Sequence, residues 1–234
     1  MKMGIIGAMD VEVALLKENM TDMLAADHAG STYFEGQLSG VDAVVVQCGV
    51  GKVNAALCAQ ILRDIYGVTH LVNTGIAGSL CADLDIGDLV VSKDAMYHDF
   101  DICYFGRAVG EVPGMGVIAF PADEMMVQTA FAAAESVNAG HTKIGRIASG
   151  DQFVCSKEKR EKIISDTQAM CTEMEGAAIA HTAYRNGIPF VILRAISDKA
   201  DDSAEMDYPT FEAIAAKRCA QVTMALAQKL KEKA

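Results

Sequence analysis

Short, continuously apolar runs rich in β-branched residues alternate with longer stretches of helical periodicity, and this alternation constrains the fold more than any other feature. Runs such as 42–47 and 190–196 are too short for surface helices and suit strands that are buried on both faces. The alternation is typical of a parallel or mixed sheet covered by helices. We therefore predict an α/β fold, a three-layer αβα arrangement in which helices flank a central, mixed and twisted sheet.

The predicted elements fill the chain without a linker. We expect strands at residues 3–8, 31–38, 42–47, 70–74, 88–92, 143–149, 169–174 and 190–196. We expect helices at residues 10–23, 52–66, 122–138, 157–165, 176–186 and 209–231. The 234 residues contain no internal repeat or low-complexity tract, so we predict one domain that spans residues 1–234.

Charge and cysteine content exclude several classes of protein. The net charge of −11 disfavours nucleic acid and anionic membranes as partners, and no apolar run reaches the roughly 18–20 residues that span a bilayer. The seven cysteines include no C-x-x-C pair, which argues against a disulfide framework or a zinc knuckle. The first residues lack the apolar core of a signal peptide. We expect a cytoplasmic protein with no membrane or nucleic-acid partner.

The segment 97–120 has no clear period, yet it carries five aromatic residues. Long loops in compact domains are usually lids, binding loops or interfaces. A solvated loop would not carry this apolar load, so we expect the segment to pack on another surface, such as a second subunit.

The ends of the predicted strands are the first place to look for a site, because ligands of open α/β sheets bind at the carboxyl ends of the strands. After the first strand, Asp10 and Glu12 either compensate the dipole of the following helix or supply a catalytic base in Glu12. After the third strand, G-V-G-K at 49–52 matches neither G-x-G-x-x-G nor Walker A, so tight packing is favoured over a phosphate site. After the fourth strand, glycines 75 and 78 permit either a close approach to a ligand or a plain turn.

The later strand ends carry the strongest signals. S-G-D-Q-F-V at 149–154 offers an aromatic side chain after a strand. Thr172 and Glu175 match a capping box, in which case Glu175 has no catalytic meaning. The strand at 190–196 leads into Asp198, and burial at such a strand mouth raises the proton affinity of a carboxylate.

Metal and nucleophile motifs are missing from the sequence. The acidic run from 198 to 207 does not have the spacing of a calcium loop, and the five histidines are scattered. Neither H-E-x-x-H nor G-x-S-x-G occurs. We predict a protein without a metal or a cofactor.

Six motifs occur in an order that resembles a known family. They are G-I-I-G-A-M-x-x-E at 4–12, G-V-G-K-V-N-A-A at 49–56, N-T-G-I-A-G-S at 73–79, S-G-D-Q-F-V at 149–154, C-T-E-M-E-G-A-A-I-A at 171–180 and R-A-I-S-D-K-A-D at 194–201. Across nearly its full length the chain resembles the bacterial 5′-methylthioadenosine/S-adenosylhomocysteine nucleosidases of the nucleoside phosphorylase superfamily. The resemblance implies a nucleoside phosphorylase-like fold.

The resemblance also implies a reaction, the hydrolysis of the N-glycosidic bond of adenosine thioethers, and of 5′-deoxyadenosine, in methionine salvage. Bond cleavage develops positive charge on the ribose and negative charge on the departing adenine. By the resemblance, Asp198 is the acid that protonates purine N7, and Glu12 is the base that activates water. Neither step requires a metal.

Binding roles follow from the same resemblance. Phe153 should stack on adenine, backbone groups of Val154 should bind its polar edge, and Glu175 should accept hydrogen bonds from the ribose hydroxyls. The other substrate-binding positions implied are Met9, Val50, Gly78, Met174, Arg194, Ser197 and Phe211.

Three loop positions, Ile102, Phe105 and Pro113, match residues that reach into the 5′-alkylthio pocket of a neighbouring subunit. The resemblance therefore implies a homodimer. One departure concerns Ile76, which occupies a position where some relatives carry a serine whose hydroxyl could help to position the Glu12 carboxylate.

Three other functions stay open at this point. A purine nucleoside phosphorylase is disfavoured because residues 8–16 contain no Lys or Arg and present Glu12, which would repel phosphate. A hydrolase of aminofutalosine in menaquinone biosynthesis is compatible with the same motifs. A non-catalytic sensor of adenosine thioethers is disfavoured by the presence of both Glu12 and Asp198.

Overall fold

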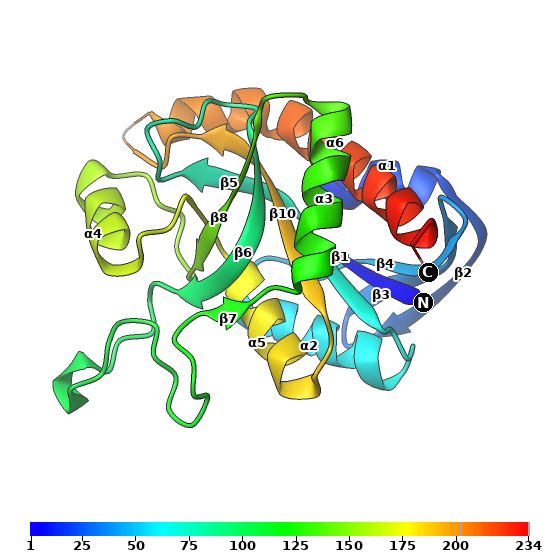
Figure 1. The fold of residues 1–234 in the computed structure, drawn as a ribbon, viewed down its shortest axis with the longest axis horizontal. Coiled ribbons are helices and arrows are strands. Elements are labelled where there is room, and N and C mark those ends of the chain that lie inside the picture. Colours follow the sequence, from blue (N-terminus) through cyan, green and yellow to red (C-terminus); the bar gives the residue numbers. More distant parts are fainter. Residues whose placement is uncertain (202, 234) are drawn as a thin grey trace.

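The computed structural model describes residues 1–201 and 203–233, without the side chains of residues 205 and 206. The strands form one sheet (Figure 1), and they are β1 (Lys2–Gly7), β2 (Met20–His28), β3 (Ser31–Leu38), β4 (Val41–Gln47), β5 (His70–Ser79), β6 (Leu89–Tyr97), β7 (Phe120–Pro121), β8 (Thr142–Ser149), β9 (Cys171–Glu173) and β10 (Phe190–Asp198). The helices are α1 (Asp10–Glu18), α2 (Lys52–Asp64), α3 (Glu124–Val137), α4 (Lys157–Thr167), α5 (Gly176–Asn186) and α6 (Ala204–Lys231), with a 3₁₀ turn at Cys103–Phe105.

Parallel pairing brings several strand ends to one edge of the sheet. β1 pairs in parallel with both β4 and β5, and β5 pairs in parallel with β10. β6 runs antiparallel to β10 and parallel to β8, and β9 joins β8 to β5. The strands β5, β10, β6, β8 and β9 thus pair in a closed ring, and the carboxyl ends of β1, β5 and β10 meet beside it.

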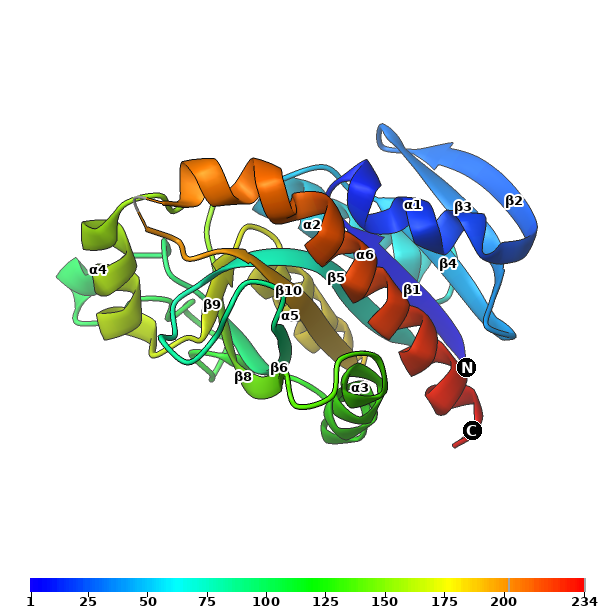
Figure 2. The same ribbon diagram turned by 90° about the horizontal axis from the view of Figure 1, so that it is seen from above.

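Helices cover both faces of the sheet, as predicted. In Figures 1 and 2, α1, α3 and α6 lie against one face, and α2 and α5 lie against the other. Each face has its own apolar core. In α2 the buried positions Ala55, Cys58, Ala59 and Leu62 have the i, i+3, i+4, i+7 spacing of a helix with one apolar face. The prediction of an α/β fold with a mixed sheet between helices is confirmed.

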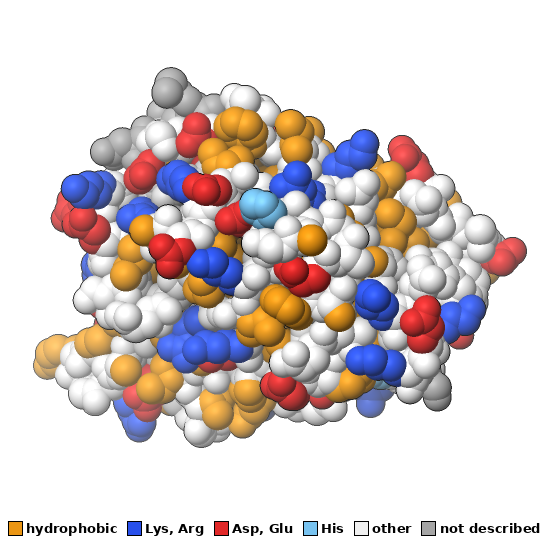
Figure 3. All heavy atoms as spheres, turned by 45° about the horizontal axis from the view of Figure 1, so that its top comes forward, with side chains coloured by type: hydrophobic (Ala, Val, Ile, Leu, Met, Phe, Trp, Pro, Cys, Tyr) orange, Lys and Arg blue, Asp and Glu red, His pale blue; other side chains and the backbone are white. Residues whose placement is uncertain are grey.

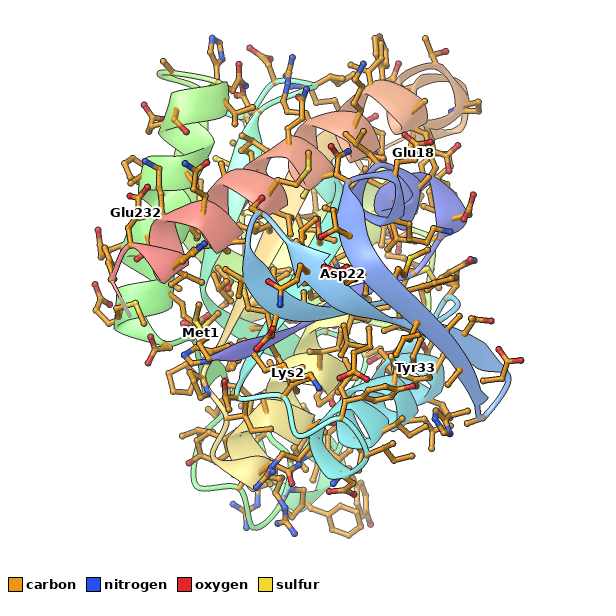
Figure 4. All side chains as sticks on the ribbon, turned by 90° about the vertical axis from the view of Figure 1, so that its right-hand side faces the viewer. Met1, Lys2, Glu18, Asp22, Tyr33 and Glu232 are labelled. Carbon is orange, nitrogen blue, oxygen red and sulfur yellow. The ribbon has the colours of Figure 1, made fainter. Side chains whose placement is uncertain are left out.

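The strand β2 was not predicted, and part of it lies where we expected the end of the helix at 10–23. The α1 helix ends at Glu18, and residues 20–28 form an edge strand paired antiparallel to β3. Figure 4 views this edge, with Glu18, Asp22 and Tyr33 labelled. Most of β2 is exposed, so it lacks the apolar alternation that marks a half-buried strand.

Further boundaries differ from the sequence analysis, those of β5, β6 and α6 among them. β5 continues beyond Thr74 to Ser79, because its pairing with β10 extends through Gly75 and Gly78. Helix α6 begins at Ala204, and Pro209, which we expected to open the helix, lies inside it. Within the described residues, no helix combines the length and apolarity needed to cross a bilayer.

Candidate active site

A cavity of about 150 Å³ opens where β1, β5 and β10 end. It is lined by ten of the residues that the sequence analysis proposed, namely Met9, Glu12, Val50, Gly78, Phe153, Val154, Met174, Glu175, Ser197 and Asp198. The fold therefore brings together side chains that lie up to 189 positions apart in the chain. The remaining lining residues are Ala8, Ile76, Ala77, Gln152, Thr172, Glu173 and Tyr208.

Glu12 lies in the first turn of α1, with its carboxylate turned back toward the end of β1. Its Oε2 accepts hydrogen bonds from the backbone N–H groups of Ala8, at 2.7 Å, and Met9, at 3.0 Å. Its Oε1 accepts one from the backbone N–H of Ile76, at 3.0 Å. Burial raises the pKa of Glu12, against the opposing effects of the Arg194 charge and these three N–H groups.

The position of Glu12 is compatible with both interpretations from the sequence. The carboxylate caps the start of α1, and it also lines the cavity. Although Ile76 has no hydroxyl, its backbone N–H donates a hydrogen bond to the Glu12 carboxylate. Gly75 is required here, since a Cβ at that position would overlap the Glu12 carboxylate.

Asp198 ends β10 and is 2% exposed. Its Oδ2 accepts a hydrogen bond from the Ser197 hydroxyl, and its Oδ1 accepts one from the backbone N–H of Ala200, both at 2.8 Å. Burial raises the pKa of Asp198, and these two hydrogen bonds only partly oppose it. A Cβ at Gly78 would lie 2.8 Å from Oδ1, so only glycine fits between β5 and this carboxyl group.

Glu173, at the end of β9, is the buried carboxylate that the sequence analysis missed. It accepts hydrogen bonds from the Ser149 hydroxyl, the Arg194 guanidinium and the backbone N–H groups of Glu175 and Gly176. Burial alone would raise the pKa of Glu173, but the Arg194 charge and these hydrogen bonds outweigh it and lower that pKa. Glu173 is thus held ionised. A buried arginine in the sequence implied such a partner but did not identify it.

Arg194 does not line the cavity, although it was expected at the substrate. It is 2% exposed and lies between the two glutamates of the β9–α5 junction. Its Nη2 donates to Glu173 and to the Asn73 side-chain oxygen, and it lies 3.9 Å from Oε2 of Glu175. These carboxylates, together with Glu12, keep the pKa of Arg194 raised despite burial, so it is a fixed positive charge behind the cavity.

The capping-box interpretation of Thr172 and Glu175 is wrong. Glu175 is itself the residue that caps α5, without a capping hydrogen bond from its side chain, and the Thr172 hydroxyl has no hydrogen-bond partner in the described structure. The Glu175 Oε1 instead accepts a hydrogen bond from the Gly51 backbone N–H, at 2.8 Å. Burial and the charge of Glu173 raise the pKa of Glu175 to about 8.

An aromatic pair closes the other side of the cavity. Phe153 follows β8, is 46% exposed, and makes an edge contact with Tyr208 of α6, with ring centroids 5.5 Å apart. The Tyr208 hydroxyl donates to Glu212, at 3.1 Å, and also contacts the Met9 sulfur. Phe153 and Tyr208 offer ring surfaces on which a planar ligand could stack.

Phe211 does not line this cavity, contrary to expectation. It lies along a separate depression with Ile86, Ile214 and Arg218. Because α6 starts five residues earlier than predicted, Tyr208, nearly one turn before Phe211, faces the cavity instead.

The turn at 49–52 is not an open phosphate site. Its backbone N–H groups at Gly51 and Lys52 already bind the carboxylates of Glu175 and Asp151, both at 2.8 Å. The Lys52 ammonium binds both oxygens of Asp99. The donors that a phosphate would need are therefore occupied by carboxylates.

The loop positions Ile102, Phe105 and Pro113 lie away from the cavity in the single chain. Phe105 is 75% exposed, and its neighbour Tyr104 is 94% exposed. Within the described residues, no group of three or more His, Cys, Asp or Glu side chains has the geometry of a metal site. Asp202, a member of the acidic run, lies outside those residues.

Comparison with known proteins agrees with this geometry. The family model of the phosphorylase superfamily matches residues 2–228. A 5′-methylthioadenosine/S-adenosylhomocysteine nucleosidase of Colwellia psychrerythraea is 39% identical over 100% of this chain and 98% of its own, and one of Geobacillus thermodenitrificans is 38% identical over 100% and 99%. The chain belongs to the 5′-methylthioadenosine/S-adenosylhomocysteine nucleosidase family of the phosphorylase superfamily. The resemblance identified from the six motifs is confirmed.

Solved structures of this family share the fold. The Colwellia psychrerythraea nucleosidase in complex with adenine has a TM-score of 0.94 and 40% identity, covering 98% of this chain and 96% of that one. The Neisseria meningitidis nucleosidase in complex with methylthio-immucillin-A has a TM-score of 0.93 and 36% identity, covering 97% and 98%. A futalosine hydrolase of Helicobacter pylori has a TM-score of 0.92 and 33% identity, covering 99% and 97%.

Proposed function

We propose that this protein is an N-glycosidase that hydrolyses 5′-methylthioadenosine and S-adenosylhomocysteine, and also 5′-deoxyadenosine. The products are adenine and 5-methylthioribose, S-ribosylhomocysteine or 5-deoxyribose. One observation carries the proposal: two carboxyl groups without a direct cationic partner, Glu12 and Asp198, line a single buried cavity in a chain of the nucleosidase family. The product thioethers would feed methionine salvage.

Asp198 acts as the general acid. Its raised pKa favours a carboxyl group that still holds a proton near neutral pH, and that proton passes to N7 of adenine. The electron pair of the glycosidic bond leaves with the purine as the bond breaks, and positive charge develops on the ribose. The Ser197 hydroxyl and the Ala200 N–H fix the orientation of the carboxyl group through this step.

Glu12 acts as the general base. Its carboxylate takes a proton from the water that attacks the anomeric carbon, and it also lies near the developing positive charge. The three backbone N–H groups that hold Glu12 favour its ionised form, against the effect of burial, and leave it little rotational freedom. The Arg194 charge favours the same ionised form from behind the cavity.

The rest of the cavity binds the nucleoside. Phe153 stacks on adenine, and backbone groups of Val154 bind its polar edge. Glu175 accepts hydrogen bonds from the ribose hydroxyls, and Arg194 acts through Glu175 without touching the substrate. Apolar contacts with the sugar and its thioether come from Met9, Val50 and Met174, and Gly78 leaves room beside Asp198.

Hydrolysis is favoured over phosphorolysis because the Gly51 and Lys52 backbone N–H groups and the Lys52 ammonium are already bound to carboxylates. Adenine release from methylthioadenosine should therefore run at the same rate in phosphate-free buffer and in phosphate. Release that depends on phosphate would identify a phosphorylase. Binding of methylthioadenosine without any turnover would identify a sensor.

A second substrate class is supported by the similarity to the Helicobacter pylori futalosine hydrolase. Aminofutalosine carries the same adenine and ribose with a different 5′ group. Parallel assays of adenine release from methylthioadenosine, adenosylhomocysteine and aminofutalosine would rank these substrates.

We also propose that the chain is one domain, residues 1–234, and that two copies of it form a homodimer in the cytoplasm. The exposed Phe105, with Ile102 and Pro113, would enter the 5′-alkylthio pocket of the second subunit, and this would explain the aromatic residues of the 97–120 segment. The free thiols of all seven cysteines suit a reducing compartment.

On the face in Figure 3, basic side chains are interspersed with acidic ones, which does not favour nucleic acid as a partner. The mechanism uses no cofactor.

A further inference from the structure

Lys52 has no role in the chemistry above, yet its ammonium group is firmly bound beside the cavity. Its Nζ lies 2.7 Å and 2.6 Å from the two carboxylate oxygens of Asp99, and 3.7 Å from Oδ2 of Asp151. It also lies 5.5 Å from the centre of the Tyr97 ring. The Lys52 side chain is only 24% exposed.

Three segments meet at this lysine. The backbone N–H of Lys52 donates to Oδ1 of Asp151, at 2.8 Å, and the backbone N–H of Asp151 donates to Oδ2 of Asp99, at 2.9 Å. The start of α2, the end of β6 and the segment after β8 are thereby joined. Gly150 makes the contact close, because a Cβ there would overlap the His98 ring.

Asp151 stands two residues before Phe153, on a segment with little internal support. Residues 150–155 form no helix or strand, and their internal backbone contact is the bond from the Gln152 N–H to the Gly150 carbonyl. Without the Lys52 ammonium, the carboxylates of Asp99 and Asp151 would be left adjacent and would repel each other. That repulsion would displace the segment that carries Phe153.

We propose that Lys52 is a positioning residue that sets the affinity of the purine end of the cavity. Its ion pairs with Asp99 and Asp151 fix residues 151–154, and so fix Phe153 against a bound purine ring. The inference rests on the proposed function for the identity of the ligand. It assigns a role to the lysine of the G-V-G-K motif, which neither the acid nor the base requires.

The ribose end of the cavity is held independently of the Lys52 side chain. Glu175 is bound by the Gly51 backbone N–H and faces Arg194. A substitution that removes only the Lys52 ammonium leaves these contacts in place. The effect should therefore fall on adenine and spare the sugar.

The test compares Lys52→Met with Lys2→Met by calorimetric titration with adenine and, separately, with 5-methylthioribose. Lys2, at the start of β1 and labelled in Figure 4, is a matched control, since it is also 24% exposed, pairs with Glu35 and lies 5.9 Å from the centre of the Tyr66 ring. We expect Lys52→Met to weaken adenine binding about tenfold, equivalent to about 1.4 kcal/mol, and to change the binding of 5-methylthioribose less than about twofold. Lys2→Met should change neither, and Lys52→Arg should restore most of the adenine affinity.

Kinetics with methylthioadenosine give a second reading. Lys52→Met should raise KM more than it lowers kcat, since the acid and the base stay in place. Equal weakening of both ligands, unchanged adenine binding, or a change confined to the oligomeric mass would overturn the proposal. If Lys52→Met does not fold, Asp99→Asn removes the same ion pair and should weaken adenine binding selectively in the same way.

The two proposals fail in distinguishable ways. Adenine binding is measured without turnover, so a parent protein that binds adenine but releases none from methylthioadenosine refutes only the nucleosidase function. A parent protein that does not bind adenine refutes both.

Discussion

Two buried carboxyl groups that line the same cavity, each at the end of a strand, have pKa values shifted in opposite directions. Glu173, at the end of β9, receives hydrogen bonds from four donors, one of them the guanidinium of Arg194, and its pKa is lowered. Asp198, at the end of β10, receives two and pairs with no cation among the described residues, and its pKa is raised. Burial alone raises the pKa of an acid, and a nearby buried cation can reverse that shift.

The difference assigns the two groups to different tasks. Glu173 is an ionised structural acceptor that holds the start of α5 and the Arg194 side chain. Asp198, whose pKa is raised, is the group that we propose as the proton donor. The contact with Arg194 therefore distinguishes the group that organises the cavity from the group that we propose reacts in it.

Asp198→Asn removes the reactive side of this contrast and should have the largest effect. The amide keeps the size of the side chain and can still accept from the Ala200 N–H, but its nitrogen must donate to the Ser197 hydroxyl, and it has no acidic proton to transfer to N7. We expect kcat for adenine release to fall about 10³-fold, within the range of general acid catalysis, with KM changed little. An unchanged kcat would show that another group protonates the purine.

Glu12→Gln should have the next largest effect. The variant keeps one side-chain oxygen, which can still accept from the Ala8 and Met9 N–H groups, but it loses the acceptor for the Ile76 N–H and cannot accept a proton from water. We expect kcat to fall about 10²-fold to 10³-fold, with adenine binding preserved in a titration. A variant that loses adenine binding as well would instead point to a structural role for Glu12.

Arg194→Met tests the organising side of the comparison. It leaves Glu173 buried without its cation, and removal of one partner of a buried ion pair costs about 3–5 kcal/mol. We expect the free energy of unfolding, measured in urea, to fall by about this amount. Arg146→Met is the control, because the pair between Arg146 and Asp94 is more exposed and should cost less. Equal losses of unfolding free energy in the two variants would contradict the claim that the buried pair of Arg194 contributes more to stability than the pair of Arg146.

Glu175→Gln should have the smallest effect on stability, and one that depends on pH. The pKa of Glu175 is about 8 in the folded protein, so the folded state retains a proton that the unfolded chain loses above about pH 4.3. The stabilisation is full below the unfolded pKa and is lost as the pH rises toward 8. Glutamine removes this dependence.

Thermal unfolding of parent and Glu175→Gln proteins from pH 5 to pH 8 checks this sign. The parent should lose more stability across the range than the variant does, while the KM of the variant for methylthioadenosine should rise. Parallel stability curves would show that Glu175 is ionised throughout.

The sequence predicted the fold where burial leaves a pattern and failed where it does not. The buried strands and the amphipathic helices were located, because apolar periodicity reports burial directly. The edge strand β2 was missed because most of its side chains are exposed, so its sequence has no apolar period. It forms a strand because it pairs with β3. The closed ring of strands also depends on long-range pairing that no local pattern encodes.

The site was predictable to the extent that motifs carry it. Glu12, Asp198 and Glu175 were identified from segments at strand ends, and the fold brings them to one cavity. The role of Glu173 was not recognised, because the sequence does not distinguish it from Glu175, two positions further on. Only the fold shows that Glu173 pairs with Arg194. Phe211 was expected from the resemblance, but α6 begins at Ala204 and places Tyr208, not Phe211, in the lining of the cavity.

The most direct test of the acid–base assignment uses a leaving group that needs no proton. In a 5-methylthioribose that carries a 4-nitrophenyl ether in place of adenine, the leaving group is 4-nitrophenolate, a stable anion. Asp198 then becomes dispensable, while Glu12 is still required. With this substrate Asp198→Asn should work within about tenfold of the parent, whereas Glu12→Gln should stay at least about 10²-fold slower. If Asp198→Asn is as impaired with 4-nitrophenolate as with adenine, Asp198 is not the proton donor and the account is wrong.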